Sequence, residues 1–348
     1  MVFIGIYWKL GFNILNLTDT NMNIVFFGSS PFAVPALRAL AQTRHRISCV
    51  VTQPDRKKGR GLHFEATAVK IAARGFGLMV YQPPKTNTDE AMAFFENFNP
   101  DLFIVISYGQ ILSRGILNIP KIFCLNVHAS ILPKYRGAAP INWAIINGEK
   151  NTGISIIKMT EKMDAGEIIM QKSTDTSDND TIITLEDKLS TMAAELLIGM
   201  LDSVENNNYQ LAPQDESRVS FAPKLKKGDG LIHWDKPAYQ IYNLIRGVVI
   251  WPGAFTYYKG KQVKIYKARV SQLSAVPCLP AGKGCQLSAG QVVKVDKEGI
   301  VVAAGKDSLI IQELQIEGKR IMRAEEFIAG HKVEAGDRLG YPASSNQI

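Results

Sequence analysis

Short apolar runs alternate with helical patterns between residues 23 and 128, and this alternation limits the possible fold more than any other feature. Apolar runs of this length predict strands, whereas apolar side chains at helical spacing predict helices. The predicted strands are 24–27, 47–52, 79–81, 102–106 and 123–127, and the predicted helices are 32–42, 66–74 and 89–97. This order is typical of an α/β fold with a doubly wound, mostly parallel sheet. Ligands of such sheets bind outside the carboxyl ends of the strands.

Two polar side chains stand at the carboxyl end of the fifth predicted strand. If residues 124–128 are extended, the period of two places Asn126 and His128 on one face, about 7 Å apart along the chain. An amide can donate hydrogen bonds to a developing oxyanion, and a neutral imidazole can accept or deliver a proton near neutral pH. Asn126 and His128 are therefore candidate catalytic residues.

A carboxylate that could orient the imidazole comes later in the chain. Asp164 lies in the polar segment 163–167, directly before the apolar pair 168–169, which predicts a loop between two strands. Each residue alone has a structural alternative: a histidine that ends a strand, an asparagine at a strand-edge turn, and an aspartate in an Asx-turn. The spacing of Asn126, His128 and Asp164 does not decide between catalysis and these structural roles.

Four sequence pieces in a fixed order resemble the signature of the folate-dependent formyltransferases. They are Asn-Val-His at 126–128, Ser-Ile-Leu-Pro at 130–133, Arg-Gly-Ala-Ala-Pro at 136–140 and Met-Asp-Ala-Gly-Glu at 163–167. The resemblance covers residue 22 to the C-terminus. It extends to shorter matches at 27–28, 52–56, 59–61, 108–109 and 251–252, and within the family it points to the tRNA formyltransferases.

The resemblance implies a Rossmann-like formyltransferase domain and a reaction. The reaction is transfer of a formyl group from 10-formyltetrahydrofolate to the α-amino group of methionine on initiator tRNA, for translation initiation. Asn126, His128 and Asp164 would be catalytic. The folate co-substrate would lie against six residues, Ile111, Leu112, Ser130, Ile131, Leu132 and Pro133. We expect no metal, because the five histidines are scattered and lack the spacing of a zinc site.

The net charge favours an anionic partner. Forty Lys and Arg against 32 Asp and Glu give +8, and the sequence pI is about 9.2. Nucleic acid, a membrane surface and a phosphorylated metabolite are all compatible with this charge. The charge alone therefore excludes only a strongly cationic partner.

Residues 53–63 form a basic segment between the second strand and the next helix. The segment is so rich in Gly and Lys that we expect a mobile loop without regular structure. A solvated surface connection is one interpretation. The other is contact with the acceptor stem of an RNA, through phosphates and unpaired bases. The residues that would make this contact are Arg56, Lys57, Lys58 and Arg60, and the family resemblance gives Arg60 the main role.

The last third of the chain has a different pattern. Strands at 263–268, 290–295, 299–303 and 309–314 follow a helix at 238–246, which predicts a small OB-like β-barrel. Basic residues gather before and within this part, and alternation along 263–267 predicts a lysine stripe on one strand face. A solvated strand face is the alternative to phosphate contact. The candidate tRNA-binding residues are Lys224, Lys226, Lys227, Lys264 and Lys267.

These patterns divide the chain into four parts. Residues 1–21 are an apolar N-terminal extension, and Met22 is a candidate for the true translation start. We expect a catalytic domain at 22–207 that ends with a long helix at 184–206, a linker at 208–227, and a tRNA-binding domain at 228–348. Four cysteines without a CxxC pair favour reduced thiols in the cytoplasm. No segment predicts a membrane span, and we expect a monomer.

Other functions stay open at this point. A related enzyme could formylate a nucleotide-linked amino sugar or glycinamide ribonucleotide, or could hydrolyse formyl-folate. The basic C-terminal part and the basic segment argue against enzymes that act on small metabolites. From a different class, the chain could be a non-catalytic RNA-binding protein, which would leave Asn126, His128 and Asp164 without a role.

Overall fold

The computed structural model of the chain describes residues 21–58, 63–272 and 287–340. The predicted N-terminal extension lies almost entirely outside these ranges. Two of the four cysteines, Cys278 and Cys285, also lie outside them. The other two, Cys49 and Cys124, are buried free thiols.

A seven-stranded sheet organises the first part of the chain, with the strand order β10-β9-β7-β6-β1-β2-β5. Five of its strands run parallel, and β9 and β10 are antiparallel additions at one edge. The strands are β1 (Asn23–Gly28), β2 (Arg46–Val51), β5 (Val80–Tyr81), β6 (Leu102–Ile106), β7 (Phe123–His128), β9 (Asn151–Lys158) and β10 (Ile168–Asp175). The predicted mostly parallel sheet is confirmed.

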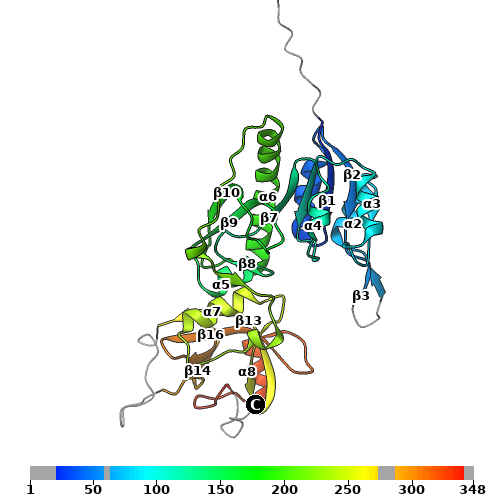
Figure 1. Cartoon of the computed structure of the whole chain (residues 1–348). Helices are drawn as coiled ribbons and strands as arrows, with labels where there is room; N and C mark the ends of the chain where they lie inside the picture. Colours follow the sequence, from blue (N-terminus) through cyan, green and yellow to red (C-terminus); the bar gives the residue numbers. More distant parts are fainter. Residues whose placement is uncertain (1–20, 59–62, 273–286, 341–348) are drawn as a thin grey trace, which may run out of the picture.

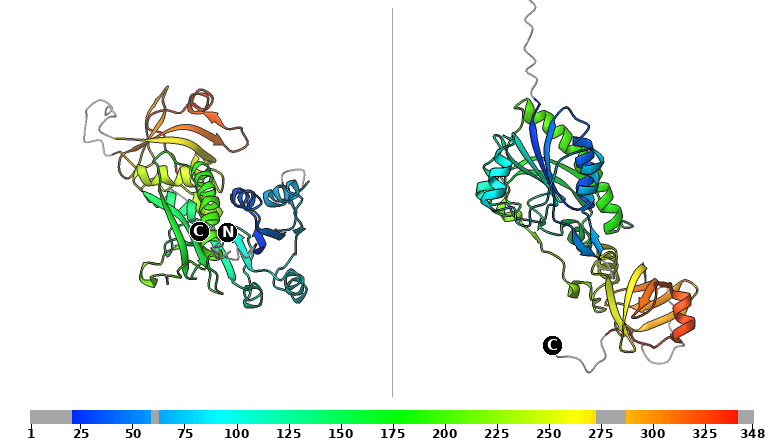
Figure 2. Two further views of the ribbon diagram at one scale, coloured as in Figure 1. Left: turned by 90° about the horizontal axis from the view of Figure 1, so that it is seen from above. Right: turned by 90° about the vertical axis from the view of Figure 1, so that its right-hand side faces the viewer.

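Helices cover both faces of this sheet, which explains why its central strands are apolar along their whole length. On one face lie α1 (Val34–Leu40), α2 (Ala68–Gly75) and α6 (Ile182–Glu205). The short helix η1 (Pro31–Ala33) precedes α1. On the other face lie α3 (Asp89–Glu96) and α4 (Arg114–Leu117). Figure 1 labels these elements, and the right-hand view of Figure 2 shows the sheet between the two layers.

The basic segment that we predicted as a loop contains two strands. Strands β3 (Arg56–Lys58) and β4 (His63–Glu65) pair antiparallel as a hairpin. Our prediction that this segment has no regular structure was therefore wrong. Pairing uses backbone groups alone, and charged side chains do not oppose it where the strands lie outside a core. In Figure 1 the hairpin projects from the side of the sheet that faces the C-terminal part.

The C-terminal part is a second, antiparallel sheet of order β12-β13-β16-β15-β14, with β17 paired to β16. Residues 336–340 connect its two edge strands by hydrogen bonds to β12 and to the start of β14. The sheet thus closes partly on itself, while the OB type stays a prediction. Its strands are β12 (Ala254–Tyr258), β13 (Lys261–Ser271), β14 (Val292–Asp296), β15 (Gly299–Ala303), β16 (Ser308–Ile316) and β17 (Met322–Arg323). Helix α8 (Ala324–His331) packs on it.

Two helices join the two parts. The short α5 (Pro140–Ile146) of the first part packs on α7 (Ala238–Gly247), which belongs to the core of the second. Buried Arg246 on α7 donates from Nη1 to the carbonyls of Ser177 (3.1 Å) and Asp180 (2.8 Å), just before α6. Figure 1 shows α5 and α7 side by side where the two parts meet, and Figure 2 shows this junction from two other sides.

In the described ranges, no helix combines the length and the hydropathy that a bilayer crossing requires.

Candidate active site

Strand β7 presents Asn126 and His128 on one face because they are two residues apart. Asn126 is opposite Val105 of β6, and His128 is opposite Ser155 of β9. The His128 side chain is only 6% exposed, whereas Asn126 is partly open to solvent. The carboxyl end of β7 thus holds one buried and one accessible polar group.

Asp164 reaches these two residues from the loop between β9 and β10. Asn126 Nδ2 donates to Asp164 Oδ1 at 3.1 Å, and the Gly137 backbone N–H donates to Asp164 Oδ2 at 2.9 Å. His128 Nδ1 lies 3.6 Å from Asp164 Oδ2. The structure therefore brings the three predicted catalytic residues into one cluster.

The surroundings of His128 determine where its protons lie. Nε2 is 2.9 Å from the Tyr135 carbonyl, and because a carbonyl oxygen only accepts, Nε2 must carry a proton. Nδ1 lies 3.6 Å from Asp164 Oδ2, which is longer than a hydrogen bond. At this separation a proton can pass between His128 and Asp164 through a bridging water or after a small movement of either side chain.

The loop that carries Asp164 has a specific backbone shape. Asp164 has φ 51°, in the left-handed region that aspartate tolerates better than most residues. Two residues later, a Cβ at Gly166 would lie 1.7 Å from the Lys158 carbonyl oxygen. Glycine is thus required at 166 for the loop to approach β9, and this approach brings Asp164 over β7.

The predicted folate-contacting residues differ in accessibility. Ile111 is 65% exposed on the loop after β6, whereas Leu112 is 2% exposed and belongs to the core. This loop is held by the Asn87 amide, which donates to the Ile111 carbonyl at 2.9 Å and accepts from the Ser113 N–H at 2.8 Å. Of the two apolar side chains, only Ile111 is available to a ligand.

The second predicted folate segment, Ser130 to Pro133, is bonded mostly within the protein. The Ser130 hydroxyl donates to the Lys134 carbonyl at 2.6 Å. Leu132 is buried, and its N–H donates to Ser155 Oγ at 3.0 Å. Ile131 and Pro133 are partly exposed. Contact of a ligand with Ser130 or Leu132 would need backbone atoms, because their side chains are buried.

Two polar atoms without hydrogen-bond partners lie near the carboxyl ends of β1 and β2. They are Ser30 Oγ and Gln53 Nε2, both buried as atoms. β1 lies between β2 and β6, where the strand order of the sheet reverses direction. Crevices at such points are the usual ligand sites of doubly wound sheets. Ser30 and Gln53 are therefore candidates for contact with a polar ligand.

The predicted basic residues of the hairpin are described only in part. Arg56 is exposed on β3. Lys57 and Lys58 are in the same strand, but their side chains lie outside the described structure, and Arg60 lies outside it entirely. The base of the hairpin is anchored by Asp55, which pairs with Lys70 at 2.6 Å and accepts from the Gln82 amide at 2.8 Å. These contacts hold the pKa of Asp55 below its usual value.

The predicted basic residues of the second part are accessible. Lys224, Lys226 and Lys227 are exposed just before and within the short helix η3 (Lys227–Gly230). On β13, Lys267 is exposed and Lys264 is partly exposed. Our argument from alternation was wrong, because a period of two puts residues 264 and 267 on opposite faces of a strand. A register shift beside Lys267 turns both lysines to the solvent side. The lysine stripe thus depends on a bulge that we did not predict.

A contact that the sequence did not indicate also reaches Asp164. Gln214, in the predicted linker, donates from Nε2 to the carbonyls of Asp164 (2.8 Å) and Gly166 (2.7 Å). Arg136 in turn donates to Gln214 Oε1. Arg136 belongs to a motif that we singled out, whereas Gln214 has no local signal.

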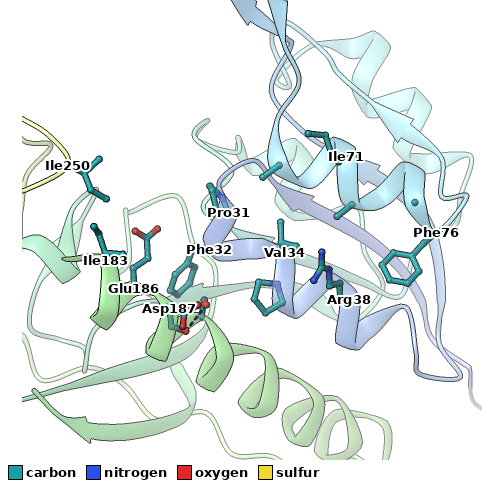
Figure 3. Close-up of a pocket in the computed structure, with 15 residues that line it drawn as sticks. Pro31, Phe32, Val34, Arg38, Ile71, Phe76, Ile183, Glu186, Asp187 and Ile250 are labelled. Atoms are coloured by element: carbon teal, nitrogen blue, oxygen red, sulfur yellow. Dashed lines mark hydrogen bonds between the residues drawn. The ribbon is translucent and has the colours of Figure 1, made fainter. Parts of the chain in front are cut away.

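A groove of about 860 Å³ lies away from this cluster, between α1, α2 and α6 (Figure 3). Its labelled walls include Phe32, Ile71, Phe76, Ile183 and Ile250, and none of the predicted site residues that the structure describes lines it. Burial raises the pKa of Glu186, which lies beside Ile183 in this groove. The lining of the groove is mostly apolar, and Asn126, His128 and Asp164 are not part of it.

Comparisons with known families and proteins match both parts of the chain. The family described as "Formyl transferase" matches residues 22–201, and "Formyl transferase, C-terminal domain" matches residues 224–332. A methionyl-tRNA formyltransferase of Citrifermentans bemidjiense is 40% identical over 321 residues, which are 92% of this chain and 97% of that protein. One of Acetivibrio thermocellus is 42% identical over 319 residues, which are 92% of this chain and 100% of that protein.

Solved structures share the fold at low identity. HypX from Aquifex aeolicus, in complex with tetrahydrofolic acid, has a TM-score of 0.60 at 15% identity, covering 93% of this chain and 51% of that one. The sugar 3N-formyl transferase WlaRD has a TM-score of 0.61 at 17% identity, covering 86% of this chain and 99% of that one. At such identities the likeness concerns the fold alone.

Proposed function

The chain belongs to the methionyl-tRNA formyltransferase family, and we propose that it transfers a formyl group from 10-formyltetrahydrofolate to the α-amino group of methionine on initiator tRNA. The product is N-formylmethionyl-tRNA for translation initiation. The observation that carries the proposal is the convergence of Asn126, His128 and Asp164 at the carboxyl end of β7. An amide donor, an imidazole and a carboxylate are the groups that acyl transfer to an amine needs.

Asn126 is the proposed oxyanion donor. The folate supplies an activated formyl group, and attack by an amine puts negative charge on the formyl oxygen. One N–H of the Asn126 amide is engaged by Asp164, so its second N–H is left to stabilise that charge. His128, two residues further along the same face of β7, is the second group proposed to stabilise that oxygen. Removal of one such donor typically lowers the rate about 10² to 10³-fold.

The proposed proton path runs through His128 and Asp164. The attacking amine has to be neutral and must lose a proton as the new C–N bond forms. Asp164 Oδ2, 3.6 Å from His128 Nδ1, can take up this proton directly or through water and share it with the ring. The Tyr135 carbonyl keeps the ring oriented by accepting from Nε2.

The proposed folate position follows from the exposed apolar side chains around the cluster. Ile111 is exposed on the loop after β6, and Met163 is exposed next to Asp164. Both can contact the flat pterin ring, and backbone groups of the loop near Ile111 and Leu112 can meet its polar edge. The second folate-contacting segment would be Ser130, Ile131, Leu132 and Pro133. This segment is fixed to β9, because the Leu132 N–H donates to Ser155 Oγ.

The proposed tRNA contacts surround the cluster. Arg56, Lys57, Lys58 and Arg60 of the hairpin segment would reach the acceptor end. Lys224, Lys226, Lys227, Lys264 and Lys267 would meet phosphates further along the RNA, without reading its bases. The amino acid end would enter beside β1 and β2, where Ser30 Oγ and Gln53 Nε2 lack partners.

We extend the proposal to the organisation of the chain. The catalytic domain would span 22–207 and the tRNA-binding domain 228–348, with 208–227 as the connection between them. The enzyme would act as a monomer in the cytoplasm, where translation takes place and where thiols such as Cys49 and Cys124 stay reduced.

An assay of formyl transfer tests the proposal. Purified protein is incubated with labelled 10-formyltetrahydrofolate and either methionyl-initiator tRNA, an amino sugar nucleotide or glycinamide ribonucleotide, and the formylated acceptor is counted. We expect label on the tRNA-bound methionine alone. Release of free formate would indicate a hydrolase. Filter binding of charged and uncharged tRNA without any transfer would indicate an RNA-binding protein instead.

A further inference from the structure

The segment between the two domains crosses the active site on its way to the second sheet. Ala212 exchanges backbone hydrogen bonds with Ile168 at the start of β10, at 2.8 and 2.9 Å. Nine residues later begins β11 (Phe221–Ala222), which pairs with β8 (Arg136–Gly137). We call residues 212–222 the connector. It is bonded to the catalytic domain at both of its ends and is not a free linker.

Gln214 of the connector uses both ends of its amide on the catalytic domain. Nε2 donates to the carbonyls of Asp164 and Gly166, at 2.8 and 2.7 Å, and so spans the turn that carries Asp164. Oε1 accepts from Arg136 Nε at 3.0 Å and Nη2 at 2.9 Å. Two donors and two acceptor positions are filled, so the amide orientation is fixed by its partners.

Arg136 and its neighbour Gly137 link Gln214 to the carboxylate of Asp164. Its side chain is 6% exposed, and beyond Gln214 it pairs with Glu216 at 2.8 Å. The next residue, Gly137, donates its N–H to Asp164 Oδ2. Gln214 therefore holds the backbone of Asp164, while the strand of Arg136 holds its carboxylate.

Asp164 needs such support for a physical reason. A non-glycine residue in the left-handed region persists only where its surroundings hold it, at a cost of about 1 to 3 kcal/mol. Proton exchange with His128 also depends on distance, and an error of about 1 Å can cost about 10²-fold in rate. The hydrogen bonds of Gln214 fix the carbonyls of Asp164 and Gly166, on either side of Ala165. They therefore stabilise the left-handed backbone of Asp164 and also set its distance from His128.

We propose that Gln214, held by Arg136, is a positioning residue that sets Asp164 for proton exchange with His128, so that the connector belongs to the active site. The inference rests on the proposed formyl transfer. Gln214 touches neither reactant; it acts through Asp164.

The variant Gln214→Glu tests the contact selectively. Glutamate keeps the length and the pairing with Arg136, but it replaces the donor NH2 by an oxygen that faces two carbonyls. We expect the single-turnover rate of formyl transfer to fall about 10²-fold. We expect the dissociation constants for tetrahydrofolate and for tRNA to stay within about threefold. The matched control is Glu216→Ala, which removes the exposed partner of Arg136, leaves Gln214 in place and should change the rate less than about twofold.

A double-mutant cycle with Asp164→Asn distinguishes positioning from general damage. If Gln214 acts through Asp164, Gln214→Glu should cost less than about threefold in the Asp164→Asn background. Single-turnover measurements with excess enzyme keep these slow rates measurable. An equal loss in both backgrounds would overturn the proposal, and so would a near-normal rate of Gln214→Glu alone.

A second variant allows the same test if Gln214→Glu does not fold. Gln214→Met keeps the length without any donor, and it should show the same rate loss and the same cycle if Gln214→Glu does not fold. The outcome is separable from that of the proposed function. Wild-type protein that transfers no formyl group refutes the function, whereas active wild type with equally active Gln214 variants refutes the positioning role alone.

Discussion

The cluster around Asp164 and the basic surface of the second domain are built in opposite ways. His128 and Arg136 are both 6% exposed, and the polar atoms near them are joined by hydrogen bonds. The lysines at 224, 226 and 227 stand exposed on a short segment before the second sheet. We therefore propose that the cluster acts through fixed geometry and that the surface acts through charge.

This difference predicts how each region responds to substitution. A group in a bonded cluster cannot be replaced by a neighbour, so its loss should be large and insensitive to salt. Charges on an open surface act together on a polyanion, so each loss should be modest, additive and strongly salt-dependent. Substitutions in the two regions therefore test this difference.

The largest effect is expected for Asn126→Ala. The variant removes the proposed oxyanion donor and one hydrogen bond to Asp164. The rate of formyl transfer should fall at least about 10² to 10³-fold, with the affinity for folate within a few-fold of wild type. Single-turnover kinetics and calorimetric titration with tetrahydrofolate measure the two quantities.

The control for this variant is Asn206→Ala, at the exposed end of α6, far along the chain from the cluster. It should leave the rate unchanged. Near-normal turnover of Asn126→Ala would remove the amide from the mechanism. A loss that disappears in low salt would show that the cluster acts through charge after all, and the contrast would fail.

The next effect concerns the basic surface. Replacing Lys224, Lys226 and Lys227 together by Ala should raise the KM for tRNA about tenfold at physiological salt, with kcat little changed. The slope of log KM against log salt should become shallower, because fewer counterions are released. The KM for the folate should not change.

A charge-matched control tests whether position matters. Lys297, Lys319 and Lys332 are also exposed, and their triple Ala variant removes the same net charge. If both triple variants raise the KM for tRNA equally, the protein attracts RNA by overall charge, and the proposed surface has no special role.

Most of the fold could be predicted because burial leaves a periodic record in the sequence. The strands at 102–106 and 299–303 begin and end where the apolar runs do, since buried strands carry continuous apolar residues. The hairpin of β3 and β4 could not be predicted, because its strands are polar and their pairing uses the backbone. The bulge beside Lys267 leaves no signal either, although it decides which way the lysine points.

The candidate site could be predicted only where its residues lie close in sequence. Asn126 and His128 share a strand, so their spacing alone places them together. Asp164 could be suggested from its polar segment before an apolar pair, but its spacing did not decide between a catalytic and a structural role. Gln214 could not be found, because it lies 50 residues from Asp164 and binds backbone carbonyls, which every residue has. A contact of this kind leaves no residue pattern.

A moderate effect is expected at the joint between the two regions. Arg246→Ala removes the hydrogen bonds from α7 to the Ser177 and Asp180 carbonyls. Unfolding by urea should show a loss of about 1 to 3 kcal/mol, because two carbonyls lose a charged donor. The KM for tRNA should rise a few-fold, since the surface is less firmly held beside the cluster, while single-turnover chemistry at saturation stays near normal. A loss in chemistry as large as that of Asn126→Ala would mean that the two regions are not separable.

The smallest effect is expected at Tyr135, whose carbonyl, and not its hydroxyl, contacts His128. Its hydroxyl donates to Glu149 at 2.8 Å and accepts from Asn147 at 3.1 Å. Tyr135→Phe keeps the carbonyl, so formyl transfer should stay within about twofold of wild type. The free energy of unfolding should fall by about 1 kcal/mol at pH 8 through loss of the hydroxyl contacts. A tenfold loss of activity would add the hydroxyl to the cluster.

The stability contributed by this hydroxyl should depend on pH in a defined direction. Burial raises the pKa of Tyr135 to about 12, whereas an unfolded tyrosine titrates near 10. The contribution is therefore complete below about pH 10, and it declines between about 10 and 12, where the unfolded chain loses its proton and the folded one keeps it. Urea titrations at pH 8 and pH 10.5 should show the difference between wild type and Tyr135→Phe shrinking as the pH rises. Because other tyrosines titrate equally in both proteins, a difference that grows with pH would mean that this phenol is not held neutral by burial.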